Sequence, residues 1–193
     1  MMRVIRRALL VTLVLTLITG VVYPLTVTVV GQLAFPDQAE GSLIRENGTV
    51  VGSRLIGQAW QGERWLYGRP SAVDYDASTS GGSNLGPASR ELADAIGSRA
   101  EEVLALENPY HPGISIDDIP SDLLLASGSG LDPEISPGAA RFQAPRVAAV
   151  RGVPLAKVFD LIDAYARRPP LDLFGSERVN VLEINRALEA MEH

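Results

Sequence analysis

The segment Gly52–Ala59, with the sequence GSRLIGQA, has the glycine spacing of a phosphate-binding loop. In such a loop, backbone N–H groups surround the phosphates, a lysine reaches the terminal phosphates, and a hydroxyl group holds magnesium. Here Gln58 stands at the lysine position and Ala59 at the hydroxyl position. Because both chemically essential side chains are missing, the segment is not expected to be a phosphate-binding loop.

Two further patterns also lack an essential group. The run Asp74–Leu85 begins like an EF-hand calcium loop, but Thr79 replaces the required glycine and Leu85 replaces the bidentate glutamate. The run Gly128–Gly130 places a serine between glycines, but Asp132 stands where a nucleophile elbow needs a third glycine. Neither pattern supports a calcium site or a serine hydrolase.

The remaining candidate groups are few. The chain has no cysteine and two histidines, His111 and His193, which excludes disulfides, thiolate catalysis and most zinc sites. Asp132 and Glu134 could act as the acid pair of a glycosidase, although an aspartate before proline more often forms an Asx turn. The sequence therefore predicts no catalytic residues, no metal site and no enzymatic activity of the chain alone.

The Ser-Gly-Gly core of Thr79–Asn84 (TSGGSN) is a stronger candidate for binding. It resembles the signature of ATP-binding cassette proteins, in which glycine amides and a serine hydroxyl contact the γ-phosphate. Glycine-rich loops do present amides to anions. The candidate nucleotide loop consists of Ser80, Gly81, Gly82, Ser83 and Asn84. The alternative is a tight loop held by its own hydrogen bonds, which touches another subunit.

The first element that positions these residues is an uncharged run from Ala8 to Phe35. A helix needs roughly 20 apolar residues to cross the hydrocarbon layer of a membrane, so this run predicts a transmembrane helix over residues 8–35. A cleaved signal peptide is the alternative, but its apolar region is normally only about 7–15 residues long. Three arginines, Arg3, Arg6 and Arg7, precede the run. Since positive charge favours the cytoplasmic flank, we expect a cytoplasmic segment 1–7 and an extracytoplasmic domain 36–193.

Small residues and a proline interrupt the predicted span at Gly20, Pro24 and Gly31. Such residues are common in membrane helices, but Pro24 should also bend the helix, and the glycines allow another helix to approach closely.

The charge of the domain limits its partners. All 23 acidic residues follow the span, together with all but three of the 17 basic residues. Nucleic acid is an unsuitable partner for this acidic surface.

The pattern after the span predicts one mixed α+β domain. The Asn47-Gly48 pair indicates a β-hairpin over Ser42–Ser53, and a buried strand or a helical turn is expected at Asp122–Ala126. Short strands are expected at Leu55–Ile56 and Arg64–Tyr67, and long loops at 69–87 and 108–120. Helices are expected after Pro87, from Pro137 with Ser136 as cap, over Arg146–Gly152, from Pro154 to a stop at Pro169-Pro170, and from Val181 with Asn180 as cap.

Seven ordered segments identify a family. They are YPL from Tyr23, GSRLIGQ from Gly52, YGRPSA from Tyr67, SGGSNLGP from Ser80, ASGSGLDPEISP from Ala126, RVA from Arg146 and RVNVL from Arg178. They are distributed over nearly the whole chain, which resembles the C subunit of the Kdp-type potassium-transporting ATPase. Two positions depart from the family pattern, because Glu134 stands where histidine is expected and Trp60 where phenylalanine is more usual.

The resemblance implies an accessory subunit of a high-affinity, ATP-driven potassium uptake pump in the bacterial inner membrane. Its partners would be a channel-like potassium-translocating subunit, a P-type ATPase subunit and a small single-helix subunit. The family is also described as a catalytic chaperone that raises the affinity of the ATPase subunit for ATP. ATP and potassium would be used by the complex rather than held by this chain, and the span would contact lipid. The residues expected to contact partners are Gly20, Pro24, Gly31, Arg69, Asn84 and Asp132.

A different class of function remains open beside this one. A membrane-anchored extracytoplasmic domain could instead bind a small ligand or a cell-wall component without any partner subunit.

Overall fold

A computed structural model describes residues 1–169 and 175–191. Internal contacts divide the chain into two compact units, Met1–Val51 and Gly52–His193, which are described separately. The predicted β-hairpin falls mainly in the first unit. The boundaries 1–7, 8–35 and 36–193 refer to a membrane and remain predictions.

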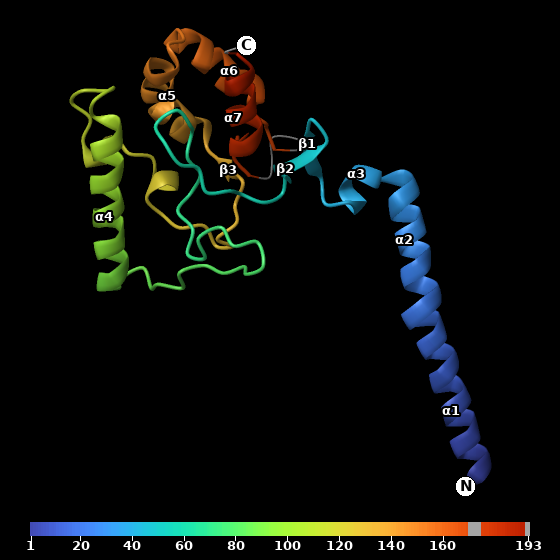
Figure 1. Cartoon of the computed structure of the whole chain (residues 1–193). Helices are drawn as coiled ribbons and strands as arrows, with labels where there is room; N and C mark the ends of the chain where they lie inside the picture. Colours follow the sequence, from blue (N-terminus) through green and yellow to red (C-terminus); the bar gives the residue numbers. More distant parts are fainter. Residues whose placement is uncertain (170–174, 192–193) are drawn as a thin grey trace. The chain divides into compact units, whose positions relative to one another are not determined.

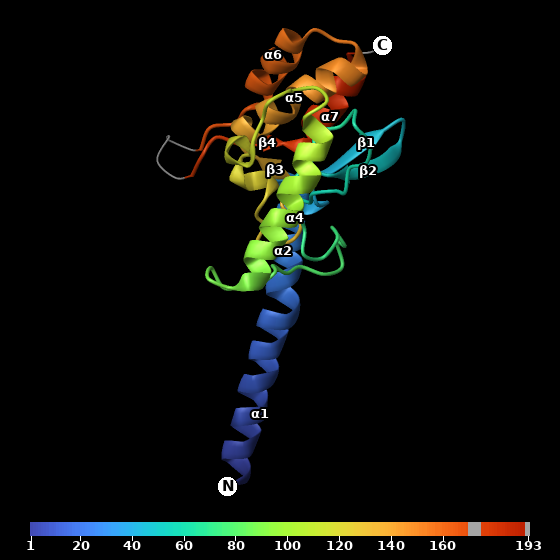
Figure 2. The same ribbon diagram turned by 90° about the vertical axis from the view of Figure 1, so that its left-hand side faces the viewer.

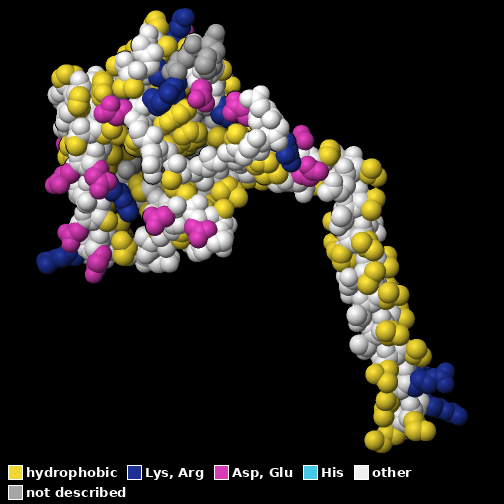
Figure 3. Space-filling view, viewed as in Figure 1, with side chains coloured by type: hydrophobic (Ala, Val, Ile, Leu, Met, Phe, Trp, Pro, Cys, Tyr) yellow, Lys and Arg dark blue, Asp and Glu magenta, His cyan; other side chains and the backbone are white. Residues whose placement is uncertain are grey.

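The first unit begins with a long apolar helix. It consists of α1 (Met2–Leu17), the π-helical turn η1 (Ile18–Val22) and α2 (Tyr23–Ala34). Figure 3 shows hydrophobic side chains along its length and basic side chains near its N-terminal end. The helix of 33 residues is the one helix in the described part of the chain that is long and apolar enough to cross a membrane. It starts before the predicted residue 8 because the basic segment continues the same helix.

The π-helical turn ends at Val22, two residues before Pro24. Proline lacks an N–H group and crowds the carbonyl of the preceding turn. The helix widens there, and the N–H of Tyr23 donates to the carbonyl of Ile18, five residues earlier. The hydroxyl of Thr19 also donates to the Leu15 carbonyl at 2.8 Å. The structure thus has a π-turn next to Pro24, and the expected bend of the helix stays a prediction.

The hairpin follows a short helix, α3 (Pro36–Ala39). Strands β1 (Leu43–Glu46) and β2 (Thr49–Ser53) pair with each other. Asn47 and Gly48 between them have φ values of 48° and 81°, as a two-residue type I′ turn requires. The prediction from the Asn-Gly pair is confirmed.

The second unit is mainly helical (Figure 1). Its helices are α4 (Arg90–Glu107), α5 (Pro137–Arg151), α6 (Leu155–Tyr165) and α7 (Val181–Ala190). Its shorter elements are the 3₁₀ turns η2 (Ile116–Asp118) and η3 (Ser121–Leu123) and the strands β3 (Glu134–Ile135) and β4 (Val179–Asn180). Helices α5, α6 and α7 lie together, and α5 contacts α4; Figure 2 views this group from the side of α4.

Helix α5 lies at the centre of this unit. Its buried side chains face in several directions and include Ala139, Ala140, Ala144 and Val147, and the small alanines allow close approach of neighbouring elements. The core is completed by side chains of α6 and α7, such as Val158, Ile162, Ile184 and Leu188. Burial of these apolar groups supplies the main stabilisation of the unit.

Capping residues fix where the helices begin. The hydroxyl of Ser136 accepts from the N–H of Ala139 at 3.1 Å, and Pro137 takes the first helical position. The side chain of Asn180 accepts from the N–H of Glu183 in the same way. Both caps follow the sequence prediction.

Several sequence predictions about this unit were wrong. Leu55–Ile56 and Arg64–Tyr67 are not strands. At Asp122–Ala126, where a strand or a helical turn was expected, the structure has a helical turn, the 3₁₀ turn η3, which confirms the second alternative. The piece Arg146–Gly152 is not separate, because α5 continues through Pro145 to Arg151. The expected stop after α6 lies partly at Pro170, outside the described residues.

The pairing of β3 with β4 was not predicted. The two strands are antiparallel, with Glu134 opposite Asn180 and Ile135 opposite Val179. Each has only two residues, which is too short for an alternation pattern to reveal.

Candidate functional site

Two loops that are distant in the sequence lie against each other in the second unit. The Ser127 N–H donates to the Pro70 carbonyl at 3.0 Å, and the Gly81 N–H donates to the Ser129 carbonyl at 2.9 Å. The Ser71 hydroxyl donates to the Gly130 carbonyl at 2.6 Å. These bonds join loop 69–87 to loop 126–133, which together carry most of the candidate residues of the domain.

The Ser-Gly-Gly loop uses part of its hydrogen-bonding capacity in this contact. The Ser80 hydroxyl and the Gly81 N–H both donate to the carbonyl of Ser129, at 3.2 and 2.9 Å. A Cβ on Gly82 would lie 3.0 Å from the Gly128 carbonyl oxygen, so this glycine permits close approach of the two loops. Two donors that a phosphate would need are therefore already occupied.

A strained turn precedes this loop. Asp74 and Tyr75 have φ values of 52° and 57°, which non-glycine residues rarely adopt. The Ser71 hydroxyl stabilises the turn by accepting from the N–H groups of Val73 and Tyr75 at 3.1 and 2.9 Å. The Tyr75 hydroxyl donates to the Arg69 carbonyl. Burial, together with the nearby Asp132 charge, raises the pKa of Tyr75 to about 12.

Arg69 and Asp132, two of the expected partner contacts, lie close to each other. A guanidinium nitrogen of Arg69 is 3.5 Å from a carboxylate oxygen of Asp132. The other carboxylate oxygen accepts from the N–H of Glu134 at 3.0 Å, which confirms the predicted Asx turn. Glu134 itself pairs with Arg178 at 2.9 Å, so the residue found in place of histidine joins β3 to the segment before β4.

The other expected partner contacts lie elsewhere. Asn84 is exposed and has a φ of 53°. Gly20 lies in η1 with no atom within 4 Å of its Cβ position, and Gly31 lies in α2, where the nearest atom is 3.9 Å away. Pro24 occupies the start of α2. These three residues of the first unit are open to an approaching helix.

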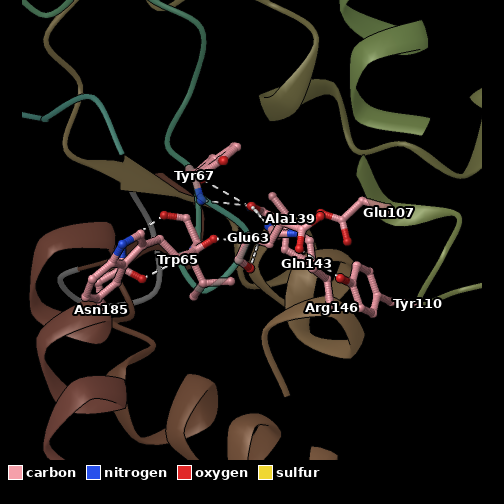
Figure 4. Close-up of polar contacts among 10 residues, drawn as sticks. Glu63, Trp65, Tyr67, Glu107, Tyr110, Ala139, Gln143, Arg146 and Asn185 are labelled. Atoms are coloured by element: carbon pink, nitrogen blue, oxygen red, sulfur yellow. Dashed lines mark hydrogen bonds and ion pairs between the residues drawn. The ribbon is translucent and has the colours of Figure 1, made fainter. Parts of the chain in front are cut away.

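A buried polar network, which the sequence did not predict, lies in the core (Figure 4). Arg146 is fully buried, and its Nε lies 2.8 Å from a carboxylate oxygen of Glu107. The guanidinium also donates to the carbonyls of Glu63 and Trp65 and to the side chain of Gln143. It thus holds the segment 63–65, which has no regular secondary structure, against α4 and α5.

Two amide side chains bind the backbone of the next residues of the same segment. The Gln143 side chain accepts from the Tyr67 N–H at 2.8 Å and donates to the Tyr67 carbonyl at 3.1 Å. The Asn185 side chain makes the same pair of bonds with the backbone of Leu66, both at 2.9 Å. Side chains of α5 and α7 therefore satisfy backbone groups that a neighbouring strand would otherwise satisfy.

The burial of Glu107 has an electrostatic consequence. Desolvation raises the pKa of its carboxyl, although the nearby Arg146 charge opposes the rise. Its second oxygen is buried without a hydrogen-bond partner. A sequence signal for this network exists, because Gln143, Arg146 and Asn185 are polar residues at core-facing positions of otherwise apolar helix faces.

The remaining motifs serve packing. The N–H of Gly57 donates to the Leu131 carbonyl at 2.8 Å, and a Cβ at Gly57 would lie 2.4 Å from the Asp132 carbonyl oxygen. The glycine spacing of the apparent phosphate loop thus allows close contact with loop 126–133. Within residues 1–169 and 175–191, no group of three or more acidic, histidine or cysteine side chains could hold a metal ion.

The fold and these contacts define a class of protein. Proteins of this class have a long apolar helix and a small domain of helices and short strands. The polar groups of the domain mainly join its own loops and helices.

Comparison with known proteins gives the family. The family model described as "KdpC: K+-transporting ATPase, c chain" matches residues 5–190. The chain belongs to this KdpC family, as the sequence predicted.

Individual relatives agree with this assignment. The potassium-transporting ATPase KdpC subunit of Caulobacter vibrioides is 52% identical over 183 residues, which cover 91% of this chain and 87% of the relative. The KdpC subunit of Polaromonas naphthalenivorans is 50% identical over 195 residues, with 100% and 97% covered. The KdpC subunit of Pseudomonas aeruginosa is 47% identical over 194 residues, with 100% of both chains covered.

Proposed function

We propose that this chain is the membrane-anchored accessory subunit of a potassium-transporting ATPase. The family match over residues 5–190 carries the proposal, because it includes both the apolar helix and the domain. The partners would be the channel-like subunit, the P-type ATPase subunit and the small single-helix subunit of the pump. The chain would contribute to assembly and activity and would leave ATP hydrolysis to its partner.

The proposed orientation places the N-terminus in the cytoplasm and the domain outside it. The arginines at positions 3, 6 and 7 support this orientation, since positive charge favours the cytoplasmic flank of a span. Cysteines introduced at Met2 and Ser83 test it in intact cells. We expect an impermeant thiol reagent to modify the cysteine at position 83 and not the one at position 2. The opposite pattern would overturn the orientation.

Any effect on the affinity of the pump for ATP would pass through partner subunits. An extracytoplasmic Ser-Gly-Gly loop would meet little ATP, and Ser80 and Gly81 already donate to Ser129. Such transmission is a coupling between sites, carried by contacts of this chain with its partners. The acidic domain would lie near the potassium entrance of the channel-like subunit, where its charge would favour cations.

Partner contacts are proposed on both units. Gly20, Pro24 and Gly31 would face partner helices in the membrane, because small residues allow close approach of helices. Arg69, Asn84 and Asp132 would contribute on the domain.

Co-purification tests the proposal. The full chain with a C-terminal affinity tag, expressed with the other pump genes, should retain the channel-like and P-type subunits in mild detergent. Recovery of the chain alone, with pump activity intact in the remaining membranes, would contradict the proposal. That result would instead support an independent domain that binds a small ligand or a cell-wall component.

A further inference from the structure

A cavity of about 510 Å³ opens in the second unit between α4 and the segment from Gln58 to Tyr75. This volume falls within the range of small-molecule sites in proteins. Ser80–Asn84 do not line the cavity, so it is separate from the candidate nucleotide loop.

Two arginines in the lining converge on one piece of backbone. A guanidinium nitrogen of Arg99 donates to the Leu124 carbonyl at 2.9 Å, and one of Arg69 lies 3.5 Å from the Leu125 carbonyl. These carbonyls belong to successive residues, and both arginines line the same cavity.

The compensation for these charges within the chain is weak. The carboxylate that pairs with Arg69 is that of Asp132, at 3.5 Å, and Arg99 donates to the Leu124 carbonyl rather than to a carboxylate. The other acids of the lining are Glu102, which is exposed, and Glu107, which is buried and pairs with Arg146. The arginine pair thus retains donors for an incoming oxyanion, which guanidinium groups bind with high geometric specificity.

The rest of the lining is largely apolar. It includes Trp60 from the segment between Gln58 and Tyr75, Val103 and Leu106 from α4, and Leu123 from η3. Trp60 packs on Trp65 with ring centroids 4.9 Å apart, which holds the indole in place. Such walls fit a flat apolar group rather than a hydrated inorganic ion.

We propose that this cavity binds a small organic oxyanion, a carboxylate or a phosphate attached to a flat apolar body. Arg69 and Arg99 hold the oxygens, and Trp60, Val103 and Leu106 contact the body. The site would add ligand binding to a subunit for which assembly is the proposed role, and it does not depend on that role.

Fluorine NMR on the full chain in detergent tests the proposal. The oxyanion probes are para-fluorobenzoate and para-fluorophenyl phosphate, and detergent without protein is the blank. Neutral para-fluorobenzamide and cationic para-fluorobenzylamine are the matched controls. We expect saturable binding of at least one oxyanion and much weaker binding of both controls. The stronger oxyanion shows whether the natural ligand carries a carboxylate or a phosphate.

Variants connect the binding to the cavity. Arg69→Gln and Arg99→Gln should each weaken oxyanion binding about tenfold or more, the range for charged hydrogen bonds. Arg141→Gln is the control, because Arg141 pairs with Asp163 and does not line the cavity. Glu102→Gln should strengthen binding by removing a negative charge, and Leu106→Trp should block it by filling the space without changing charge.

Three results would overturn the proposal. They are absence of saturable binding for both oxyanions, equal or tighter binding of the amide or the amine, and unchanged oxyanion affinity in both arginine variants. If an arginine variant does not fold, the Glu102→Gln and Leu106→Trp variants decide: affinity unchanged in both would also overturn the proposal.

Discussion

Replacement of Arg146 by methionine should strongly destabilise the domain. Arg146 is fully buried, and its guanidinium has Glu107, the backbone of segment 63–65 and Gln143 as partners. Methionine has a similar length but no donors. The substitution leaves the Glu107 carboxylate buried without its charge partner and two carbonyls without their donor.

The expected loss in the free energy of unfolding is about 3–5 kcal/mol, as measured for buried ion pairs that lose one partner. The exposed pair Arg168–Glu177 provides a matched control, because its side chains are 73% and 48% exposed. Arg168→Met should cost only about 0–1 kcal/mol. The double variant Arg146→Met/Glu107→Gln should recover part of the loss, since it removes the unpaired charge.

The pH dependence gives an independent check. Burial already raises the pKa of Glu107, and loss of the Arg146 charge should raise it further. A carboxyl whose pKa is higher in the folded protein favours folding at low pH, and this contribution is lost as pH rises from the unfolded to the folded pKa. The loss in the free energy of unfolding that Arg146→Met causes should therefore become smaller as the pH falls.

Urea unfolding of the full chain in detergent, followed by tryptophan fluorescence, measures these effects. Both tryptophans, Trp60 and Trp65, lie in the second unit, and the Trp65 carbonyl accepts from Arg146 at 2.9 Å. A loss below about 1 kcal/mol for Arg146→Met, the ceiling for an exposed pair, would refute the reasoning. So would a loss that does not change with pH.

Three further predictions follow from single residues. The pKa of Tyr75 is raised from 10.0 to about 12, so the protein should lose stability as the pH rises between these values. Tyr75→Phe should remove this part of the loss, which thermal midpoints measured across this pH range can detect. An unchanged dependence of the thermal midpoint on pH would contradict this. Gly82→Ala should lower the free energy of unfolding in urea by about 1–3 kcal/mol, because the new Cβ would lie 3.0 Å from the Gly128 carbonyl oxygen. Gly81→Ala should lower it less, because its Cβ would meet no atom closer than 3.7 Å. Neither glycine variant should change ATP crosslinking to this chain, and loss of crosslinking in folded protein would support direct contact. Gly20→Leu should leave the domain folded, because no atom lies within 4 Å of the new Cβ, yet reduce co-purification of partner subunits; unchanged recovery would remove Gly20 from the interface.

Local signals in the sequence predicted much of the fold. The uncharged run predicted the long helix, the Asn47-Gly48 pair predicted the hairpin turn, and Ser136 and Asn180 predicted helix starts. Each of these features depends on neighbouring residues, so periodicity and capping rules can detect it.

Features that depend on distant residues were missed. Segment 64–67 has strand-like residues, but its backbone bonds go to the side chains of Gln143, Arg146 and Asn185 instead of a strand. A separate helical piece was expected over Arg146–Gly152, yet α5 continues through Pro145 to Arg151 and has buried side chains on several sides. Sequence separations of 76 to 119 residues in these contacts lie beyond any local pattern.

The candidate site was predicted in part. The sequence placed Arg69, Asp132 and the Ser-Gly-Gly loop among the functional candidates, and the structure brings Arg69 within 3.5 Å of Asp132. The sequence did not predict that Arg69 and Arg99 line the same cavity, because they lie 30 positions apart and each contacts a different carbonyl of a later turn, that of Leu125 and that of Leu124.

The most direct test of the proposed role is potassium-stimulated ATP hydrolysis by the purified pump. The pump is prepared from cells that lack this chain and is assayed before and after addition of the full-length protein in detergent. An accessory subunit required for activity should restore potassium-stimulated hydrolysis, while the Gly20→Leu variant should restore less. Full potassium-stimulated hydrolysis without the chain would contradict the account.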